Sequence, residues 1–317
     1  MGAGSLLYNF SPMKFDLHFH TTFSDGHKTP EEAVQIAKKN GLWFIACTDH
    51  DIINTKVPEL ARMYGIETLE WVELSSADYG NKNKAAHLTC YARKFQGRIL
   101  SVLDNIQEAK TSKVLQQIEK LQKGGFLIEE EAFLEYWTKL GSNIANLNNG
   151  NIKEYLFKNP LNEAIAREKI GETYEQATFV RQALSRTGDF AHIGSVDNLP
   201  EYEPSVEICG ELAKENNAVL SIAHPNYSFK SIEEFQKLVP SYVERGVNAL
   251  EIHYSTPPDW IQTILETRNR FNLLLTFWSD CHFNPKRDGK HGTLGELNSH
   301  MDPTFIENEF QKFQEAL

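Results

Sequence analysis

A pair of histidines two residues apart constrains this chain more than any other feature. The stretch from Asp16 to Asp25 reads DLHFHTTFSD, and its first residues alternate polar and apolar side chains as a strand does. Residues i and i+2 of a strand point to the same face, so His18 and His20 would project into one site. Two imidazoles on one strand form a preorganised clamp for a metal ion. Taken alone, such a pair is more often two surface histidines on an edge strand.

Further residues of metal-ligand type recur at the ends of later predicted strands. The apolar run 42–48, bounded by Gly41 and Asp49, is typical of a strand buried on both faces. Predicted strands at 67–74, 85–92, 218–223, 247–253 and 273–279 follow it. The ligand-type positions are His18, His20, Asp25, His50, Glu73, His87, His224, Asp280 and His282. Each alone has a plainer explanation, as a turn former, a solvated charge or a core histidine, but their repetition favours a metal site.

The order of the predicted elements indicates an α/β barrel. Helices alternate with these strands, and Thr29-Pro30-Glu31-Glu32 is a helix start with Thr29 as N-cap. Ligand types at the carboxyl ends of several strands are typical of a parallel β/α barrel, here with about seven strands. From about 95 to 200 the pattern becomes helical and polar, interrupted by an Asn-rich loop at 141–151. We therefore expect a first barrel part at 13–95, an inserted helical cap subdomain at 96–200 and a second barrel part at 201–317.

Charge and cysteine usage restrict the class of protein. A net charge of −11 argues against a broad nucleic-acid-binding face, although bound cations can reverse the field at a phosphate site. Four widely spaced cysteines without a C-x-x-C pair fit reduced thiols, and no apolar run is long enough to span a bilayer. Residues 1–12 lack the layout of a secretory signal and read as a short arm or leader. We expect a cytoplasmic protein without a membrane partner.

Taken together, the motifs resemble those of the PHP (polymerase and histidinol phosphatase) family of metal-dependent phosphoesterases. They are DLHFHTTFSDG at 16–26, TDHD at 48–51, VELS at 72–75, His87, AHP at 223–225 and SDCH at 279–282. The resemblance implies a distorted, TIM-like (β/α)7 barrel that binds two to three divalent metal ions. The long helical insertion is similar to that of the nucleotide-phosphatase branch of the family.

The resemblance also implies how the ligands are shared among the ions. His18, His20, Glu73 and Asp280 would hold one ion, and Asp25, His50 and His282 a second. Glu73 would bridge to a third ion held with His87 and His224, and His224 is also assigned a part in catalysis. The mixed nitrogen and oxygen ligands suit manganese, zinc or iron better than magnesium, which prefers oxygen.

Two further residues are assigned to catalysis or substrate binding. The segment FVRQAL at 179–184 resembles a family element in which an arginine contacts substrate phosphate, so Arg181 is either that contact or an ordinary solvated arginine. The branch usually has a histidine soon after this arginine, where Gln182 and Ala183 stand here. Asp49 either supports His50 or a proton transfer, or only caps the loop. The roles of His192 and His253 stay open.

The expected function is hydrolysis of a phosphomonoester of a small metabolite or nucleotide through a metal-activated water. The partner would be a small phosphorylated substrate, and no extended nucleic-acid duplex is expected. Two alternative enzyme hypotheses are an exonuclease or oligoribonuclease acting on short nucleic-acid ends, and a histidinol-phosphatase-type enzyme. A degenerate metal-binding regulatory module is the non-enzyme alternative. It predicts lost ligands, and all nine are present.

Overall fold

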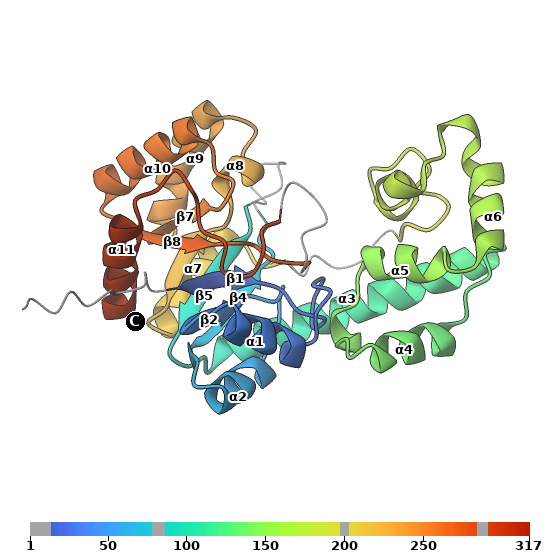
Figure 1. Ribbon diagram of the computed structural model, residues 1–317. Coiled ribbons are helices and arrows are strands. Elements are labelled where there is room, and N and C mark those ends of the chain that lie inside the picture. The colour runs from blue at the N-terminus through green and yellow to red at the C-terminus, as the bar shows by residue number, and fades with distance from the viewer. Residues whose placement is uncertain (1–13, 78–85, 197–202, 284–290) are drawn as a thin grey trace, which may run out of the picture.

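The structure is a computed structural model that describes residues 14–77, 86–196, 203–283 and 291–317. Figure 1 shows a part that contains all the described strands and, beside it, a purely helical part. The predicted arm at 1–12 lies outside the described residues, as does the predicted boundary at 200. No helix in the described ranges combines the length and apolar character needed to cross a membrane.

The described strands form two sheets. Their order is β1-β2-β3 in one and β4-β5-β6-β7-β8 in the other. The bounds are β1 Phe15–Phe19, β2 Phe44–Cys47, β3 Glu67–Thr68, β4 Glu70–Leu74, β5 Leu88–Ala92, β6 Val219–Ile222, β7 Ala249–His253 and β8 Leu274–Trp278. The single strand predicted at 67–74 is split at Leu69, because its first residues pair with β2 and the rest pair with β5.

The predicted ring of seven parallel strands is not confirmed. The strands belong to an α/β arrangement, but among the described residues the strand pairing between the two sheets consists of isolated bridges, Phe19 with Cys281 and His50 with Glu73, and no continuous ladder closes a ring. Regular pairing ends there because the backbone turns left-handed at Asp51 (φ 54°) and at Asp280 (φ 52°). Left-handed residues break the extended geometry that a ladder needs.

Strand β5 departs from the parallel expectation in a way that matters for the site. It runs antiparallel to both β4 and β6, with Leu88 opposite Leu74 and Ile222. Its amino end therefore lies at the edge where the neighbouring strands have their carboxyl ends. His87, which directly precedes β5, is brought to that edge by this reversal.

Helices cover the sheets and form a core with them. They are α1 Pro30–Lys39, α2 Lys56–Met63, α7 Val206–Glu215, α8 Pro225–Ser228, α9 Ile232–Glu244, α10 Pro258–Phe271 and α11 Pro303–Ala316. The predicted start of α1 is confirmed, since Thr29 accepts from the backbone N–H of Glu32 in a capping box with Pro30 in the first turn. On α11, Phe310 stacks on Phe15 of β1 with ring centroids 4.0 Å apart.

The helical part has its own hydrophobic cluster, and we call residues 98–195 the cap. Its elements are α3 Arg98–Lys123, α4 Glu130–Lys139, η1 Ile144–Asn146, α5 Asn149–Leu156, α6 Pro160–Ile170, η2 Gly171–Thr173, η3 Gln176–Thr178 and the π-helical turn η4 Val180–Leu184. The predicted Asn-rich loop contains two of these starts, because Asn143 caps η1 and Asn148 caps α5.

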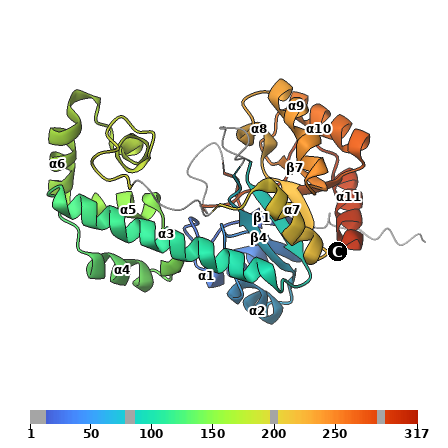
Figure 2. The ribbon, with the colours of Figure 1, turned by 180° about the vertical axis from the view of Figure 1, so that it is seen from behind.

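Helix α3 joins the two parts, as Figures 1 and 2 show from opposite sides. Ile99, Leu103 and Ile106 in its first half are buried in the core around the sheets. Val114 and Ile118 in its second half are buried in the cap cluster. One continuous helix therefore fixes the cap to the sheets.

Candidate metal centre

The residues predicted as metal ligands gather at one edge of the sheets. Seven of them line a cavity of about 290 Å³, together with Tyr227 and His291. The seven are Asp25, His50, Glu73, His87, His224, Asp280 and His282. The remaining two, His18 and His20, are 0% and 2% exposed and lie against Glu73 at the base of this group. All nine predicted ligands are thus brought together.

Glu73, whose side chain is 1% exposed, lies at the centre of the group. One of its oxygens, Oε2, lies near nitrogens of three imidazoles, at 2.9 Å from His18 Nε2, 3.1 Å from His20 Nε2 and 3.5 Å from His50 Nδ1. The other oxygen, Oε1, is 3.1 Å from His87 Nδ1 and 3.2 Å from His224 Nε2. The carboxylate therefore faces two separate sets of imidazoles with its two oxygens.

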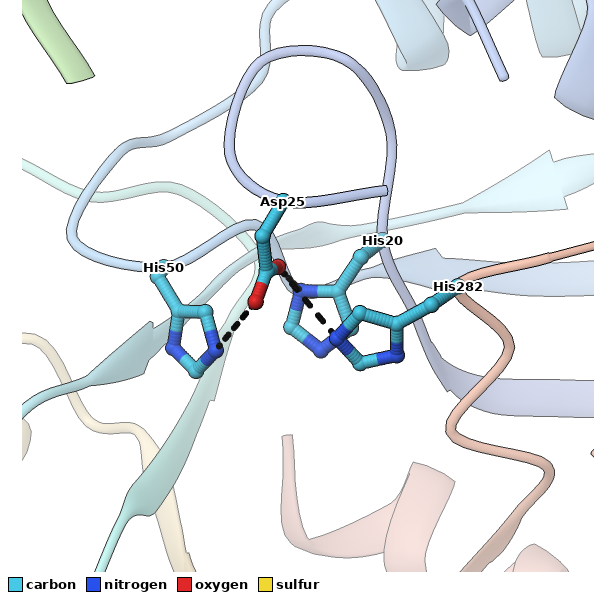
Figure 3. A group of neighbouring side chains, drawn as sticks. All are labelled: His20, Asp25, His50 and His282. Carbon is cyan, nitrogen blue, oxygen red and sulfur yellow. Dashed lines mark ion pairs between the residues drawn. The ribbon is translucent and has the colours of Figure 1, made fainter. Parts of the chain in front are cut away.

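Asp25 forms a second centre with three imidazoles, drawn in Figure 3. Its Oδ1 lies 3.6 Å from His20 Nδ1 and 3.3 Å from His282 Nε2, and its Oδ2 lies 3.7 Å from His50 Nε2. The side chains come from the loop after β1, the end of β1, the loop after β2 and the segment after β8. Ligand types from four places in the chain converge here.

Asp280 connects the two groups. Its Oδ1 is 3.5 Å from His18 Nε2, 3.4 Å from His20 Nε2 and 3.4 Å from His282 Nδ1. Its backbone N–H donates to the carbonyl of His18 at 2.9 Å, which fixes the segment after β8 beside β1. Asp280 is held in the left-handed region, a backbone strain that is common at functional sites.

Two more backbone features shape the centre. His224 has φ 32°, and its N–H donates to Glu251 Oε2 at 2.6 Å, which holds this strained residue in place. Gly26 follows Asp25 in a tight turn, where a Cβ atom would lie 2.3 Å from the carbonyl oxygen of His20. Only glycine fits that turn, so Gly26 is required to bring Asp25 over the imidazoles.

The three carboxylates of the centre have lowered pKa values, although burial alone would raise them. Burial would raise the pKa of Glu73, but the charges of His18 and His50 hold that pKa well below its ordinary value. In the same way His282 outweighs burial and keeps the pKa of Asp25 and of Asp280 well below the ordinary range. These three carboxylates are therefore ionised at neutral pH, as metal ligands are.

The donor set fits divalent metal ions. His50 Nδ1 and Asp280 Oδ1 are buried and have no hydrogen-bond partner among the described residues. A buried polar atom without a partner costs folding free energy, and a bound ion would remove that cost by serving as the partner of both atoms. The Nε2 atoms of His18 and His20 lie 2.7 Å apart and point to the same place, as ligands of one ion do.

Asp49 lies beside the centre rather than in it. It is fully buried, and its carboxylate accepts from the Thr21 N–H and hydroxyl at 2.7 Å each, from the Ser24 hydroxyl at 2.7 Å and from Asn54 Nδ2 at 2.8 Å. These bonds hold the loop after β1 that carries Asp25. Asp49 was predicted either to support His50 or a proton transfer, or to cap the loop. These hydrogen bonds are of the kind that a loop-capping residue makes.

Arg181 lies in the cap, in the π-helical turn η4, and its side chain is exposed. It is not among the residues that line the cavity over the metal-ligand group. His192 is also exposed in the cap. His253 is buried, its Nδ1 lies 2.8 Å from the Ser255 hydroxyl, and burial lowers its pKa to about 3. Neither histidine belongs to the ligand groups found among the described residues.

Sequence reasoning missed two residues at the centre. His291 Nε2 lies 3.9 Å from Asp280 Oδ2, and its ring centroid is 4.1 Å from that of His282. It follows no predicted strand, so no local pattern marked it. Glu251, which accepts from the His224 N–H, was predicted only as part of the strand at 247–253. The E-x-H pattern that it forms with His253 at the end of this strand could have marked it as a site residue.

A larger cleft opens between the cap and the loop after β1. Two adjoining cavities of about 410 and 390 Å³ share Asp25, His27, Asn151 and Glu154 in their linings. The first is also lined by Lys153 and other cap residues, namely Asn148, Gly150, Phe157, Lys158 and Gln176. Because Asp25 also lines the cavity over the metal-ligand group, the cleft and the centre adjoin at this residue.

The gathered imidazoles and carboxylates fit a metal-dependent phosphoesterase, and comparison with known proteins shows the family. The PHP domain family matches residues 16–178, about half of the chain. This chain belongs to the PHP domain family, and the predicted activity class, hydrolysis of phosphate esters, is confirmed.

Two known proteins share sequence with the chain. Phosphoribosyl 1,2-cyclic phosphate 1,2-diphosphodiesterase of Eggerthella lenta is 24% identical over 273 residues, which cover 84% of this chain and 93% of the relative. A 5'-3' exoribonuclease of Haemophilus influenzae is 30% identical over 114 residues, only 35% of this chain and 41% of that enzyme.

Two solved structures share the fold over 96% of both chains. An amidohydrolase from Chromobacterium violaceum, solved with sulfate and no metal, has a TM-score of 0.69 at 19% identity. A protein from Bifidobacterium adolescentis, assigned as a metal-dependent phosphoesterase, has a TM-score of 0.67 at 22% identity. At these identities the likeness concerns the fold, including the inserted cap.

Proposed function

We propose that this protein hydrolyses a phosphomonoester of a small metabolite or nucleotide at two to three divalent metal ions. The position of Glu73 carries the proposal, because its two oxygens face two separate sets of imidazoles, as a bridging carboxylate must. When bound, paired ions lower the pKa of a water and stabilise charge on the phosphoryl oxygens.

The residues would divide among the ions as follows. His18, His20, Glu73 and Asp280 hold the first ion, Asp25, His50 and His282 hold the second, and His87 and His224 hold the third together with Glu73. Manganese, zinc and iron fit this mixture of nitrogen and oxygen ligands better than magnesium. His20 lies near both of the first two groups, so its imidazole would stand between them.

The substrate would extend from the metal centre into the cleft beside the cap. With the phosphoryl group in the cavity lined by Asp25 and Glu73, the rest of a small molecule reaches the cleft past Asp25. Lys153 offers an ammonium there, and Asn148 and Asn151 offer amides that can orient a polar leaving group. Clefts of this size suit small ligands rather than a nucleic-acid duplex.

Arg181 remains our candidate for a further phosphate contact. Its side chain is exposed, so the guanidinium is accessible for a two-point contact with an anion. Asp49 would act indirectly, by holding the loop that carries Asp25.

A second candidate is hydrolysis of a cyclic phosphate diester of a phosphorylated sugar. The observation that favours it is the match to the Eggerthella lenta phosphodiesterase, which covers nearly the whole of that enzyme. The exoribonuclease match spans about a third of this chain, and the net charge of −11 gives it no support. All nine ligands are present and converge, which argues against a degenerate regulatory module.

A hydrolysis screen in the presence of added manganese, zinc, iron or magnesium tests the proposal. The substrates are mononucleotides, nucleoside bisphosphates, phosphoribosyl 1,2-cyclic phosphate, histidinol phosphate and short oligoribonucleotides. We expect phosphate release from a monoester. Turnover confined to the cyclic phosphate would select the second candidate, and turnover confined to oligonucleotides would select the exonuclease alternative. Turnover confined to histidinol phosphate would narrow the proposed monoester activity to a histidinol-phosphatase-type enzyme.

Two matched histidine variants distinguish the loss of a predicted metal ligand from the general effect of replacing a histidine by asparagine. His224→Asn should abolish turnover, because it removes an imidazole that faces Glu73. His192→Asn changes an exposed cap histidine and should retain wild-type turnover. Absence of turnover on every substrate with every metal would refute the proposed activity.

A further inference from the structure

Asn146 connects the cap to two loops of the metal centre. It ends the 3-10 turn η1 and is only 2% exposed. Its side-chain amide donates to the carbonyl of Phe23 at 3.0 Å and to the carbonyl of His50 at 2.5 Å. Its side-chain oxygen accepts from Lys110 Nζ at 3.0 Å. Two carbonyls require N–H donors and an ammonium requires an acceptor, so the partners fix the orientation of this amide.

Lys110 makes a second connection from helix α3. Its Nζ lies 2.6 Å from Asp51 Oδ2, and the two side chains are 16% and 0% exposed. Asp51 also accepts from the N–H and the hydroxyl of Ser75 at 2.8 Å each. One turn before Lys110, Gln107 Nε2 donates to the backbone carbonyl of Asp51 at 3.2 Å. Asp51 thus ties the loop after β2 to the end of β4 and to the cap.

The loops that these contacts hold are the ones that carry ligands. Phe23 lies two residues before Asp25, His50 is itself a predicted ligand, and Ser75 lies two residues after Glu73. The loop after β2 is joined to β4 by the single bridge of His50 with Glu73, in which the Asp51 N–H donates to the Glu73 carbonyl at 2.9 Å, and no strand ladder includes Phe23 or Ser75 among the described residues. Asn146 and Asp51 are buried and Lys110 is half-buried, so their polar contacts are costly to break, because a buried amide or carboxylate would be left unpaired.

We propose that the cap is a structural component of the metal centre, with Asn146 and Lys110 as positioning residues that hold Asp25 and His50 in ligand geometry. The inserted cap therefore lines the proposed substrate cleft and also holds two loops of the metal centre. The ion held by Asp25, His50 and His282 depends on it, whereas the ions held by Glu73 with His18 or His87 depend on the strands. The part of this inference that concerns ions rests on the proposed function, while the part that concerns loop order does not.

The first test is hydrogen exchange of the metal-free protein. Asn146→Leu keeps the volume but removes all three polar contacts, and Asn146→Asp keeps only the acceptor for Lys110. Both should speed exchange several-fold in segments 21–26 and 48–52, and leave β6 and β7 unchanged. Asn159→Ala is the matched control, because Asn159 caps α6 within the cap. It should leave segments 21–26 and 48–52 at wild-type rates.

The second test is metal affinity, measured by competition with a chelator using manganese or zinc. One equivalent should bind about 10–100-fold more weakly in both Asn146 variants, as is usual for residues that orient ligands, and the other equivalents should be unchanged. Lys110→Arg should restore part of the affinity that Lys110→Met loses.

Wild-type exchange in both segments for both Asn146 variants would overturn the inference. So would equal weakening of every metal equivalent. A wild-type protein that binds no metal would refute the proposed function instead, and the exchange experiment would still decide whether the cap holds these loops.

Discussion

Replacing Glu73 by glutamine tests the arrangement of the centre most directly. The amide keeps the shape of the carboxylate but removes its charge. Each of the two oxygens of Glu73 faces a different set of imidazoles, at 2.9–3.5 Å for Oε2 and 3.1–3.2 Å for Oε1. If Glu73 bridges two ions, one substitution weakens both.

The expected magnitude follows from burial and distance. The Glu73 side chain is 1% exposed, so solvent screens its charge only weakly. Two unit charges about 4 Å apart interact by about 4 kcal/mol at an effective dielectric constant of about 20. At about 1.4 kcal/mol per factor of ten, this is about a thousandfold loss of affinity, which is a lower limit for a divalent ion in contact. Turnover should fall with metal content, because the ions supply the activated water.

The assay measures metal equivalents, chelator-competition affinity and kcat/KM on the best substrate of the screen. Glu309→Gln is the matched control, since Glu309 on α11 is also buried at 2% exposure and pairs with Arg268 at 2.7 Å. That control should lose about 1.5–3 kcal/mol of stability and keep its metal. If Glu73→Gln keeps every ion at wild-type affinity with wild-type kcat/KM, the bridging role is wrong.

Three other substitutions test separate parts of the account. Arg181→Ala should lose roughly 2–5 kcal/mol in kcat/KM at unchanged metal content, with partial rescue by Arg181→Lys; an unchanged kcat/KM would make Arg181 an ordinary solvated side chain. Asp49→Ala should weaken the ion bound by Asp25 about 10–100-fold in chelator competition, and unaltered affinity would contradict its role in holding the loop after β1. Burial raises the pKa of Asp16 from 3.8 to about 7, so the folded state binds a proton that the unfolded state has lost, and this contribution to stability disappears as pH rises through about 7. Urea unfolding at pH 5 and pH 8 should therefore show the wild type losing about 2.6 kcal/mol relative to Asp16→Asn, because about two pH units of the shift lie between pH 5 and the folded-state pKa of about 7, and parallel pH curves would refute the assignment.

The sequence identified the chemistry of the centre because ligand type and strand period are local properties. His18 and His20 share a face by the period of two, and Asp25-Gly26 marks the turn that returns a carboxylate. Seven of the nine predicted ligands line one cavity, with the other two beneath Glu73. The helical character of the insertion was likewise readable from its spacing and composition.

The direction of each strand was not readable in the same way. The alternation of strands and helices indicated a parallel ring, but β5 runs antiparallel and the sheets are joined by isolated bridges. Strand direction depends on which neighbour accepts the backbone hydrogen bonds, and a single strand carries no record of that choice. His87 reached the centre through this reversal rather than through a strand's carboxyl end.

What the sequence by itself determined is therefore the nine predicted ligands, without His291, and their placement at element ends. Only the tertiary structure decided how they are grouped around the two oxygens of Glu73, and which cap residues hold their loops. Lys110 is 59 residues from Asp51 in the chain, and Asn146 is 123 residues from Phe23. Contacts over such separations follow from how α3 packs against both cores, and local sequence patterns contain no information about that packing.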